Sequence, residues 1–218
     1  MPGLFITMEG PDGAGKTTVI EKLIPLLKER TNVTITSTRE PGGSRIAEDI
    51  RQIILDVQNV EMDVRTEAIL YAAARRQHLT DRILPNLEKG GIVFCDRFVD
   101  SSLVYQGVAR GIGIKEVYQL NQFATAGKTP DVTLYLDVPA EIGLERIHLA
   151  KGNRQFDRLD QEGLQFHKMV RQGYLDIIPT DPERFIQIDA TKTVDEVVQE
   201  CLTALVDRYP EYFTNGER

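Results

Sequence analysis

The sequence predicts a three-layer α/β fold, in which a five-stranded, mostly parallel sheet lies between two layers of helices. Short apolar runs alternate with longer segments of helical periodicity, and a glycine-rich turn directly follows the first run. Strands that alternate with helices are joined by right-handed crossovers, which produce a parallel sheet covered on both faces. The composition agrees, because 41% of the 218 residues are hydrophobic and 27% are charged, as in soluble globular domains. We expect a single domain over residues 1–218.

The expected elements follow from the apolar periodicity. We interpret five apolar runs as strands buried on both faces: residues 4–8, 33–36, 92–95, 132–136 and 185–188. Seven segments have the helical period: residues 16–29, 44–55, 64–88, 114–126, 140–149, 159–178 and 194–207. Local signals support two of these helices, since Thr193 and Glu196 have the spacing of a capping box and Pro139 suits a first helical turn.

The acidic composition excludes some classes of partner. The formal net charge is −7, whereas a protein that binds polynucleotides usually carries a basic stripe. No apolar run approaches the roughly 18 residues that a membrane span requires, and the N-terminus lacks the features of an export signal. Cys95 and Cys201 do not have the spacing of a metal site, and we expect both to be small buried side chains. These observations predict a cytoplasmic protein that binds neither nucleic acid nor membranes.

The glycine-rich turn matches the phosphate-binding pattern G-x-x-x-x-G-K-[ST]. Its residues are Gly10, Pro11, Asp12, Gly13, Ala14, Gly15, Lys16 and Thr17, followed by Thr18. The glycines let successive backbone N–H groups point toward phosphate oxygens, and the helix that begins near Lys16 adds its positive end. Lys16 would reach the β- and γ-phosphates of ATP, while the Thr17 hydroxyl would bind Mg²⁺. The motif lies between a strand and a helix, so it predicts a P-loop NTPase fold with ATP and Mg²⁺ as ligands.

An acidic residue ends the third apolar run. Asp96 follows residues 92–95 and would hold Mg²⁺ through water, as the Walker B acid does. A regulatory GTPase would have D-x-x-G after such a strand and N-K-x-D further along, and neither is found there. Arg97, directly after this acid, indicates a second anion nearby and hence phosphoryl transfer to another phosphate.

Two phosphate ligands held by an acidic chain need a local supply of positive charge. Their mutual repulsion grows as the dielectric falls, and so does the attraction of any cation near them. Six arginines lie in loops or on a helix face that could border a cleft: Arg39, Arg75, Arg76, Arg97, Arg154 and Arg158. We therefore expect several of them to gather around the phosphates.

Several segments, taken in order, resemble bacterial thymidylate kinases. They are the P-loop, T-R-E-P-G-G at 38–43, the helical segment at 71–76 and D-R-F-V-D-S-S-L-V-Y-Q-G at 96–107, followed by 133–137, 158–160 and 188–191. The resemblance covers about residues 4–206, and the T-R-E-P-G-G and D-R-[FY]-x-x-S-x-x-[AV]-Y-Q-G patterns together are highly specific. It implies a kinase that phosphorylates dTMP to dTDP with ATP·Mg²⁺ in dTTP biosynthesis.

The resemblance implies roles at the sugar and phosphate of dTMP. Asp12 would contact the 3′-hydroxyl group, and Arg39 and Arg97 would hold the 5′-phosphate. Tyr105 lies where a ribose 2′-hydroxyl would have to fit. Asp12 stands where many relatives have Glu, which shortens the side chain by one methylene group without removing the carboxylate.

The resemblance also implies a set of base-reading residues. Tyr71, where relatives commonly have Phe, would stack on thymine, and Arg75 would donate to a base carbonyl. Ser102 and Gln106 would read the base edge, and Arg51 would line the same pocket. These groups suit thymine, which offers two carbonyl acceptors, one N–H donor and a methyl group.

A polar segment between two expected helices resembles the lid of the family. It spans about residues 149–159 and contains Arg154 and Arg158. The P-loop holds no arginine, and for such a loop the resemblance implies that the lid supplies the catalytic one, with Arg158 as the first choice and Arg154 as the second. An arginine that stabilises transition-state charge can raise a rate by about 10³ or more.

The remaining implied features are the adenine site and the quaternary structure. Arg146 resembles the arginine that stacks on adenine, and Ala190 would border the other side of that base. This chain has an apolar stripe over residues 63–88, most of which intramolecular packing explains. The resemblance implies that the family pairs through helices in this region. A symmetric homodimer is therefore expected.

Two other functions stay open from the residues alone. The first is a kinase for a different nucleoside monophosphate or a small hydroxyl substrate, which a panel of acceptors would distinguish. The second is a nucleotide-binding switch ATPase, which would transfer phosphate only to water and normally show D-x-x-G after the second apolar strand.

Overall fold

The computed structural model describes residues 1–149 and 162–214, in which five strands form one parallel sheet. The strands are β1 (Leu4–Glu9), β2 (Ile35–Arg39), β3 (Ile92–Asp96), β4 (Val132–Asp137) and β5 (Phe185–Asp189). Their spatial order is β2-β3-β1-β4-β5, and each neighbouring pair is parallel. The predicted five-stranded α/β architecture is therefore confirmed.

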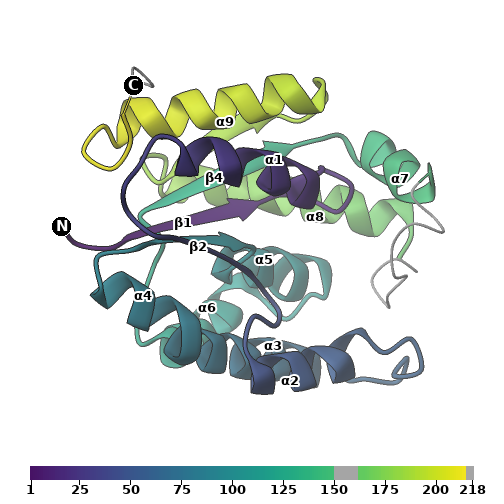
Figure 1. Cartoon of the computed structure of the whole chain (residues 1–218). Helices are drawn as coiled ribbons and strands as arrows, with labels where there is room; N and C mark the ends of the chain where they lie inside the picture. The colour runs from purple at the N-terminus through teal and green to yellow at the C-terminus, as the bar shows by residue number, and fades with distance from the viewer. Residues whose placement is uncertain (150–161, 215–218) are drawn as a thin grey trace.

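Helices cover both faces of this sheet (Figure 1). The α-helices are α1 (Lys16–Lys28), α2 (Arg45–Leu55), α3 (Val64–His78), α4 (Leu84–Glu88), α5 (Val99–Ser102), α6 (Ile114–Thr125), α7 (Ala140–Leu149), α8 (Leu164–Ile177) and α9 (Val194–Arg208). Two π-helical segments, η1 (Leu79–Ile83) and η2 (Leu103–Ala109), and the short 3₁₀ helix η4 (Ile178–Thr180) complete the described elements. Helices α1 and α9 lie together above the sheet in Figure 1, while α2 to α6 lie below it.

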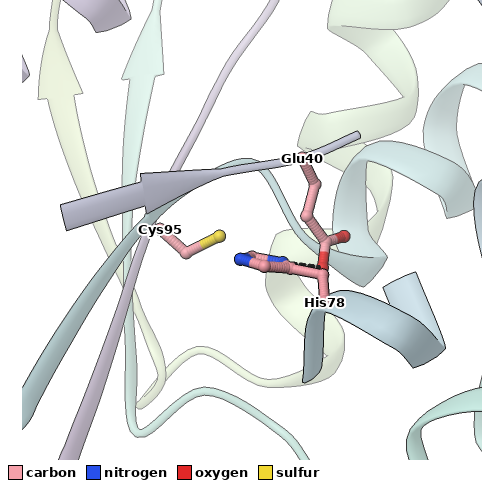
Figure 2. A group of neighbouring side chains, drawn as sticks. All are labelled: Glu40, His78 and Cys95. Carbon is pink, nitrogen blue, oxygen red and sulfur yellow. Dashed lines mark hydrogen bonds and ion pairs between the residues drawn. The ribbon is translucent and has the colours of Figure 1, made fainter. Parts of the chain in front are cut away.

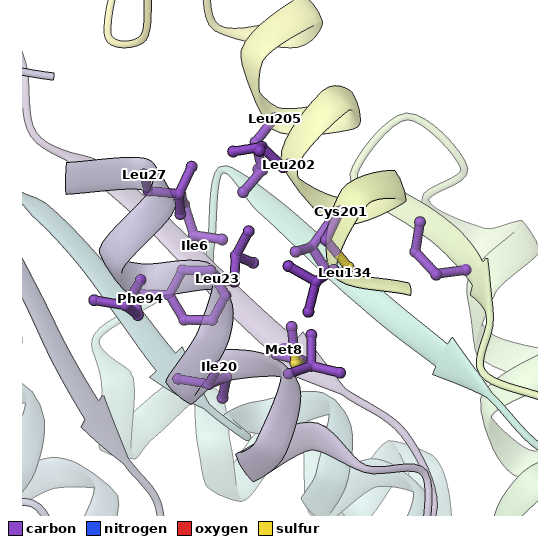
Figure 3. Close-up of a cluster of buried hydrophobic side chains, with 14 of the residues drawn as sticks. Ile6, Met8, Ile20, Leu23, Leu27, Phe94, Leu134, Cys201, Leu202 and Leu205 are labelled. Carbon is purple, nitrogen blue, oxygen red and sulfur yellow. The ribbon is translucent and has the colours of Figure 1, made fainter. Parts of the chain in front are cut away.

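The main core lies between the sheet and the helix pair α1 and α9 (Figure 3). Strand residues such as Ile6 and Met8 point to this side because side chains alternate along a strand. They meet Leu23 of α1 and the buried thiol of Cys201 on α9. Two further clusters fill the opposite face, one beneath α8 and η2 and the other beneath η1 and α4.

The helix starts show why these segments fold as they do. The Thr193 hydroxyl and the Glu196 carboxylate form the predicted capping box at the start of α9. Helix α1 begins at Lys16 after Gly15, whose φ of 87° is accessible to glycine at little cost. Because all five strands are parallel, their carboxyl ends and the loops that follow share one edge of the sheet.

Some sequence predictions differ from the structure. The second strand spans Ile35–Arg39 rather than 33–36, and it is only partly buried because it lies at the edge of the sheet. The predicted helix 64–88 changes to π-helical geometry after His78, and α4 then begins next to Pro85. No helix was predicted over 99–109, where α5 and η2 lie. Helix α8 begins at Leu164 rather than 159, and the expected lid falls mainly outside the described residues.

None of the helices described here is long and apolar enough to cross a membrane.

Candidate active site

A cavity of about 980 Å³ opens at the carboxyl edge of the sheet. The P-loop, the ends of β2 and β3, helices α2, α3 and α7, segment η2 and the loop after β5 all contribute to its wall. The predicted binding residues line it, with the exception of Gly10 and Pro11. Arg154 and Arg158 lie outside the described residues, and Arg76 points away to donate to the Ala124 carbonyl. The structure thus gathers segments that lie up to 185 residues apart, as Asp12 and Val197 do.

The P-loop is held by close backbone packing. A Cβ atom on Gly13 would lie 2.1 Å from the carbonyl oxygen of Gly143 on α7, and its φ is +78°. A Cβ atom on Gly143 would in turn lie 2.7 Å from the Asp12 carbonyl oxygen. Both glycines are therefore required for the loop to rest against α7.

The ammonium group of Lys16 lies inside the curve of the P-loop. Its Nζ atom donates to the carbonyls of Gly10 and Pro11, each at 2.9 Å. These two residues do not line the cavity, but they hold the Lys16 ammonium group in place. Burial and the neighbouring charge of Arg97 lower the pKa of Lys16 to about 8, although nearby carboxylates oppose that shift.

Asp12, Arg97 and Tyr105 form one polar cluster on the cavity wall. Arg97 donates to Asp12 at 2.5 Å and to the Gly10 carbonyl at 3.1 Å, while the Tyr105 hydroxyl donates to the other Asp12 oxygen at 2.8 Å. Burial would raise the pKa of Asp12, but the charges of Arg97 and Lys16 outweigh it and leave that pKa below its ordinary value. Arg97 has a φ of 66°, so the chain turns sharply to aim this guanidinium at the P-loop.

The buried carboxyl group of Glu9 supports the Arg97 turn and was missed by the sequence interpretation. Its Oε1 atom accepts the backbone N–H groups of Phe98 at 2.7 Å and Ser101 at 3.3 Å. Its Oε2 atom accepts the hydroxyls of Ser101 at 2.6 Å and Tyr174 at 2.8 Å. Burial, reinforced by the charge of Asp100, raises the pKa of Glu9 to about 7.

Arg75 forms the floor of the other end of the cavity. Its Nε atom donates to Glu40 at 2.6 Å, and its two terminal nitrogens donate to Ser102 at 2.9 Å, to Asn121 and to the Phe98 carbonyl at 2.9 Å. These four bonds use four of the five N–H groups that a guanidinium carries. Within residues 1–149 and 162–214 the fifth N–H group has no hydrogen-bond partner, so it can donate to a ligand. Glu40 and Asn121 were missed, since only the fold brings them to Arg75.

Behind Arg75, Glu40, His78 and Cys95 form a buried group (Figure 2). These residue types can bind metals, but the ring nitrogens of His78 already contact Glu40 at 3.0 Å and the Thr38 hydroxyl at 2.7 Å. The other Glu40 oxygen is paired with the Arg75 cation, and burial raises the pKa of the Cys95 thiol well above its ordinary value. A metal would require a thiolate and free ligand atoms, so we interpret the group as support for Arg75.

Four other predicted substrate residues lie on the wall near Arg75. Tyr71 lies one helical turn before it on α3, and Arg51 donates to the Pro41 carbonyl at 2.8 Å. Arg39 forms a bidentate salt bridge with Glu48, in which its two terminal nitrogens donate to the two carboxylate oxygens at 2.9 and 3.1 Å. Gln106, on η2, donates a hydrogen bond from its amide nitrogen to Glu67 at 2.9 Å.

Asp96 and Thr17 both line the cavity. The Oδ1 atom of Asp96 is buried and has no hydrogen-bond partner among the described residues. A buried carboxylate oxygen without a donor is suited to a cation or to the water around it. The oxygen atoms of these two residues therefore fit the requirements of a magnesium site.

Arg146 and the loop after β5 form another part of the cavity wall. Arg146 donates to the Ala190 carbonyl at 2.9 Å and approaches the Gly13 carbonyl at 3.5 Å. The adjoining wall residues Lys192, Thr193, Val194 and Val197 were not predicted. Their position directly after the last strand could have indicated them, because ligands of parallel sheets bind beyond the carboxyl ends of strands.

The chain is similar to known proteins over most of its length. The family model described as thymidylate kinase matches residues 8–201. Thymidylate kinase of Lacticaseibacillus casei is 54% identical over 213 residues, which cover 98% of this chain and 100% of the relative. Thymidylate kinase of Geobacillus sp. is 56% identical over 208 residues, which cover 95% of this chain and 98% of the relative.

A solved structure is similar as well. The crystal structure of thymidylate kinase from Ehrlichia chaffeensis is 31% identical and superposes with a TM-score of 0.77 over 94% of this chain and 100% of that one. The residues matched by the family model include the P-loop, the Arg97 turn and Arg75. The chain therefore belongs to the thymidylate kinase family.

Proposed function

We propose that the protein transfers the γ-phosphoryl group of ATP to dTMP, giving ADP and dTDP. The observation that carries this proposal is the single cavity that joins the P-loop to the Arg75 floor. Its volume of about 980 Å³ is at the upper end of the range for small-molecule sites, which suits two nucleotides rather than one.

Lys16 and Arg97 would neutralise the phosphates as they approach each other. Both cations line the cavity, and Lys16 is buried while the Arg97 side chain is 17% exposed. Their attraction for phosphate is stronger there than in bulk water, because the dielectric is lower. The 5′-phosphate of dTMP would attack in line without a strong base, since it is already ionised at neutral pH. Catalysis would then consist of positioning and charge stabilisation.

Mg²⁺ would be held by the Thr17 hydroxyl and, through water, by Asp96. The metal would supply charge neutralisation between the β- and γ-phosphates. Asp96 stays an acceptor in this role, and the unpartnered Oδ1 atom is the group that would face the ion or its water.

The sugar and base of dTMP would lie between Tyr105 and Arg75. Asp12 would accept the 3′-hydroxyl group, and Tyr105 would leave no room for a ribose 2′-hydroxyl. Tyr71 would stack on thymine, while the remaining Arg75 donor would reach a base carbonyl next to Ser102. Arg39 would exchange Glu48 for the 5′-phosphate, with Arg51 beside it.

The lid, about residues 149–159, would close over the phosphates and bring Arg158 or Arg154 to the transferring group. Closure would exclude water as a competing acceptor. Arg158→Ala should lower kcat about 10³-fold with little change in the affinity for dTMP, measured by steady-state kinetics and calorimetry. Full activity in this variant would assign the catalytic role to another residue, with Arg154→Ala as the next variant.

We further infer that the chain forms one kinase domain, that it acts in the cytoplasm and that it works as a homodimer. The partners would be dTMP and ATP, with no nucleic acid or membrane. The net charge of −7 and the family membership support these inferences.

A panel of phosphate acceptors tests the proposed reaction. ADP release with ATP·Mg²⁺ would be compared for dTMP, dUMP, UMP and dGMP, with a no-acceptor reaction as the control. We expect dTMP to give the highest kcat/KM and the no-acceptor reaction to be slow. If another monophosphate is used and dTMP is not, the substrate assignment is wrong, and ADP release without any acceptor would indicate an ATPase.

A further inference from the structure

The amide group of Gln106 is held by a carboxylate outside the cavity. Its Nε2 atom donates to Oε1 of Glu67 at 2.9 Å, and both side chains are 1% exposed. Gln106 lines the cavity from η2, whereas Glu67 lies on α3 and is not part of the cavity wall. Arg110 reaches the same Glu67 oxygen at 3.5 Å and donates to Glu162 at 2.6 Å.

A glutamine side chain is an ambiguous reader of a base. Its amide has a donor end and an acceptor end of nearly the same shape, and a half-turn exchanges them. An unrestrained Gln106 could therefore face either a ring N–H group or a ring nitrogen lone pair. Such a residue therefore discriminates between bases only if its amide is held in one orientation.

Glu67 removes this ambiguity. A carboxylate can only accept hydrogen bonds, so the NH₂ end of Gln106 must face it. The reversed amide would place two oxygens opposite each other at 2.9 Å in a buried site, where unsatisfied polar groups are costly. The guanidinium group of Arg110 balances the buried charge of Glu67, so the carboxylate can be kept there.

We propose that Glu67 is a positioning residue that determines base specificity by turning the Gln106 oxygen toward the nucleobase. This inference rests on the proposed function, because it concerns how the same pocket reads the base of a monophosphate. An outward-facing oxygen selects a pyrimidine with an N–H group at ring position 3, as in thymine or uracil. It disfavours cytosine, which has a lone pair at that position.

The test replaces Glu67 with Met, which has a similar length but no acceptor. In E67M the Gln106 amide can turn, so its donor end becomes available to cytosine. We expect the ratio of kcat/KM for dTMP to that for dCMP to fall about tenfold. dTMP stays preferred, because Arg75 is unchanged and still favours a base carbonyl. Binding of the two monophosphates by calorimetry should show the same change in ratio.

Two control variants separate orientation from charge and packing. E67Q keeps an oxygen that Arg110 draws to the Oε1 position, so it should retain the wild-type ratio within about twofold. E162M removes the other carboxylate partner of Arg110 but does not contact Gln106, so it should also leave the ratio unchanged. Thermal unfolding of each variant reports any general loss of structure. If E67M fails to fold, E67D keeps the charge but shortens the reach to Gln106 and should lower the ratio in the same direction.

Two results would overturn the proposal. If E67M lowers kcat/KM for dTMP and dCMP in parallel, Glu67 only stabilises the pocket. If E162M shifts the ratio as much as E67M does, the effect passes through Arg110 and not through Gln106. A wild-type protein that does not use dTMP would instead refute the proposed function, which keeps the two failures distinct.

Discussion

At the scale of single residues, Lys16 is held where its positive charge is least favourable until a phosphate arrives. It is buried, it lies near Arg97, and among the described residues its hydrogen-bond acceptors are two backbone carbonyls. A triphosphate would replace these neutral partners with charged oxygens and stabilise the ammonium form. The free protein and the ATP complex should therefore differ in how they respond to pH.

We expect kcat/KM for ATP to fall above about pH 8, because the free protein then loses the Lys16 proton. The profile of kcat at saturating ATP should stay flat to higher pH, since bound phosphates raise the pKa of this group. Steady-state kinetics across the alkaline range would measure both profiles, kcat/KM for ATP and kcat at saturating ATP. The K16A variant should lose most turnover at every pH. A kcat/KM profile that is level to about pH 9.5 would contradict the lowered pKa.

At the scale of elements, the site depends on contacts between segments that are distant in sequence. Glu9 ends β1, yet its carboxyl group accepts backbone N–H groups at the start of α5, and so acts as an N-terminal cap supplied by another element. The same carboxyl group accepts a hydroxyl from α8. Strand, turn and helix are thereby fixed around Arg97.

The raised pKa of Glu9 predicts a pH-dependent stability. Its folded-state pKa of about 7 exceeds the ordinary 4.5, so the folded protein holds this proton more tightly than the unfolded chain. The resulting stabilisation is complete below about pH 4.5 and is lost as the pH rises through about 7. In urea unfolding, the free energy of unfolding should therefore fall less between these pH values in E9Q than in the wild type. The exposed control E61Q should follow the wild type, and equal slopes for E9Q and wild type would refute the shift.

The contact between α7 and the P-loop predicts an unusual effect of alanine. A helix-interior glycine replaced by alanine ordinarily gains about 1 kcal/mol. In G143A, however, the new Cβ would lie 2.7 Å from the Asp12 carbonyl oxygen, so α7 and the loop must separate. We expect a loss of about 1–3 kcal/mol in the free energy of unfolding and a higher KM for ATP. G163A, at the N-cap of α8, is a control without such a contact, because no atom of the described residues lies within 4 Å of the new Cβ. A G143A protein of increased stability with unchanged KM would refute this account.

At the scale of the whole molecule, the parallel five-stranded sheet and most helices could be predicted, because periodicity and the P-loop are local signals, whereas the strand order comes only from the structure. The edge strand was shifted because Val33 is as apolar as Ile35, and only pairing with β3 decides the register. The helices after Arg97 were missed because that segment has no simple helical period. In the site, the motif residues were identified, whereas Glu9 and Asn121 were not, since their partners lie 92 and 46 residues away.

Exposed apolar side chains lie on α3, within the region 63–88 that the family resemblance assigns to a dimer, and on α6, which packs against α3. Ile69 on α3 is 56% exposed and Phe123 on α6 is 89% exposed, although both residue types are usually buried. A twofold interface repeats each residue, so one added charge introduces two like charges across it. We therefore expect I69E to shift the protein from dimer to monomer in sedimentation velocity. V60E, at an apolar residue that is 68% exposed but outside these helices, should leave the dimer intact. A wild type that sediments as a monomer, or an I69E protein that remains dimeric, would exclude this face as the interface.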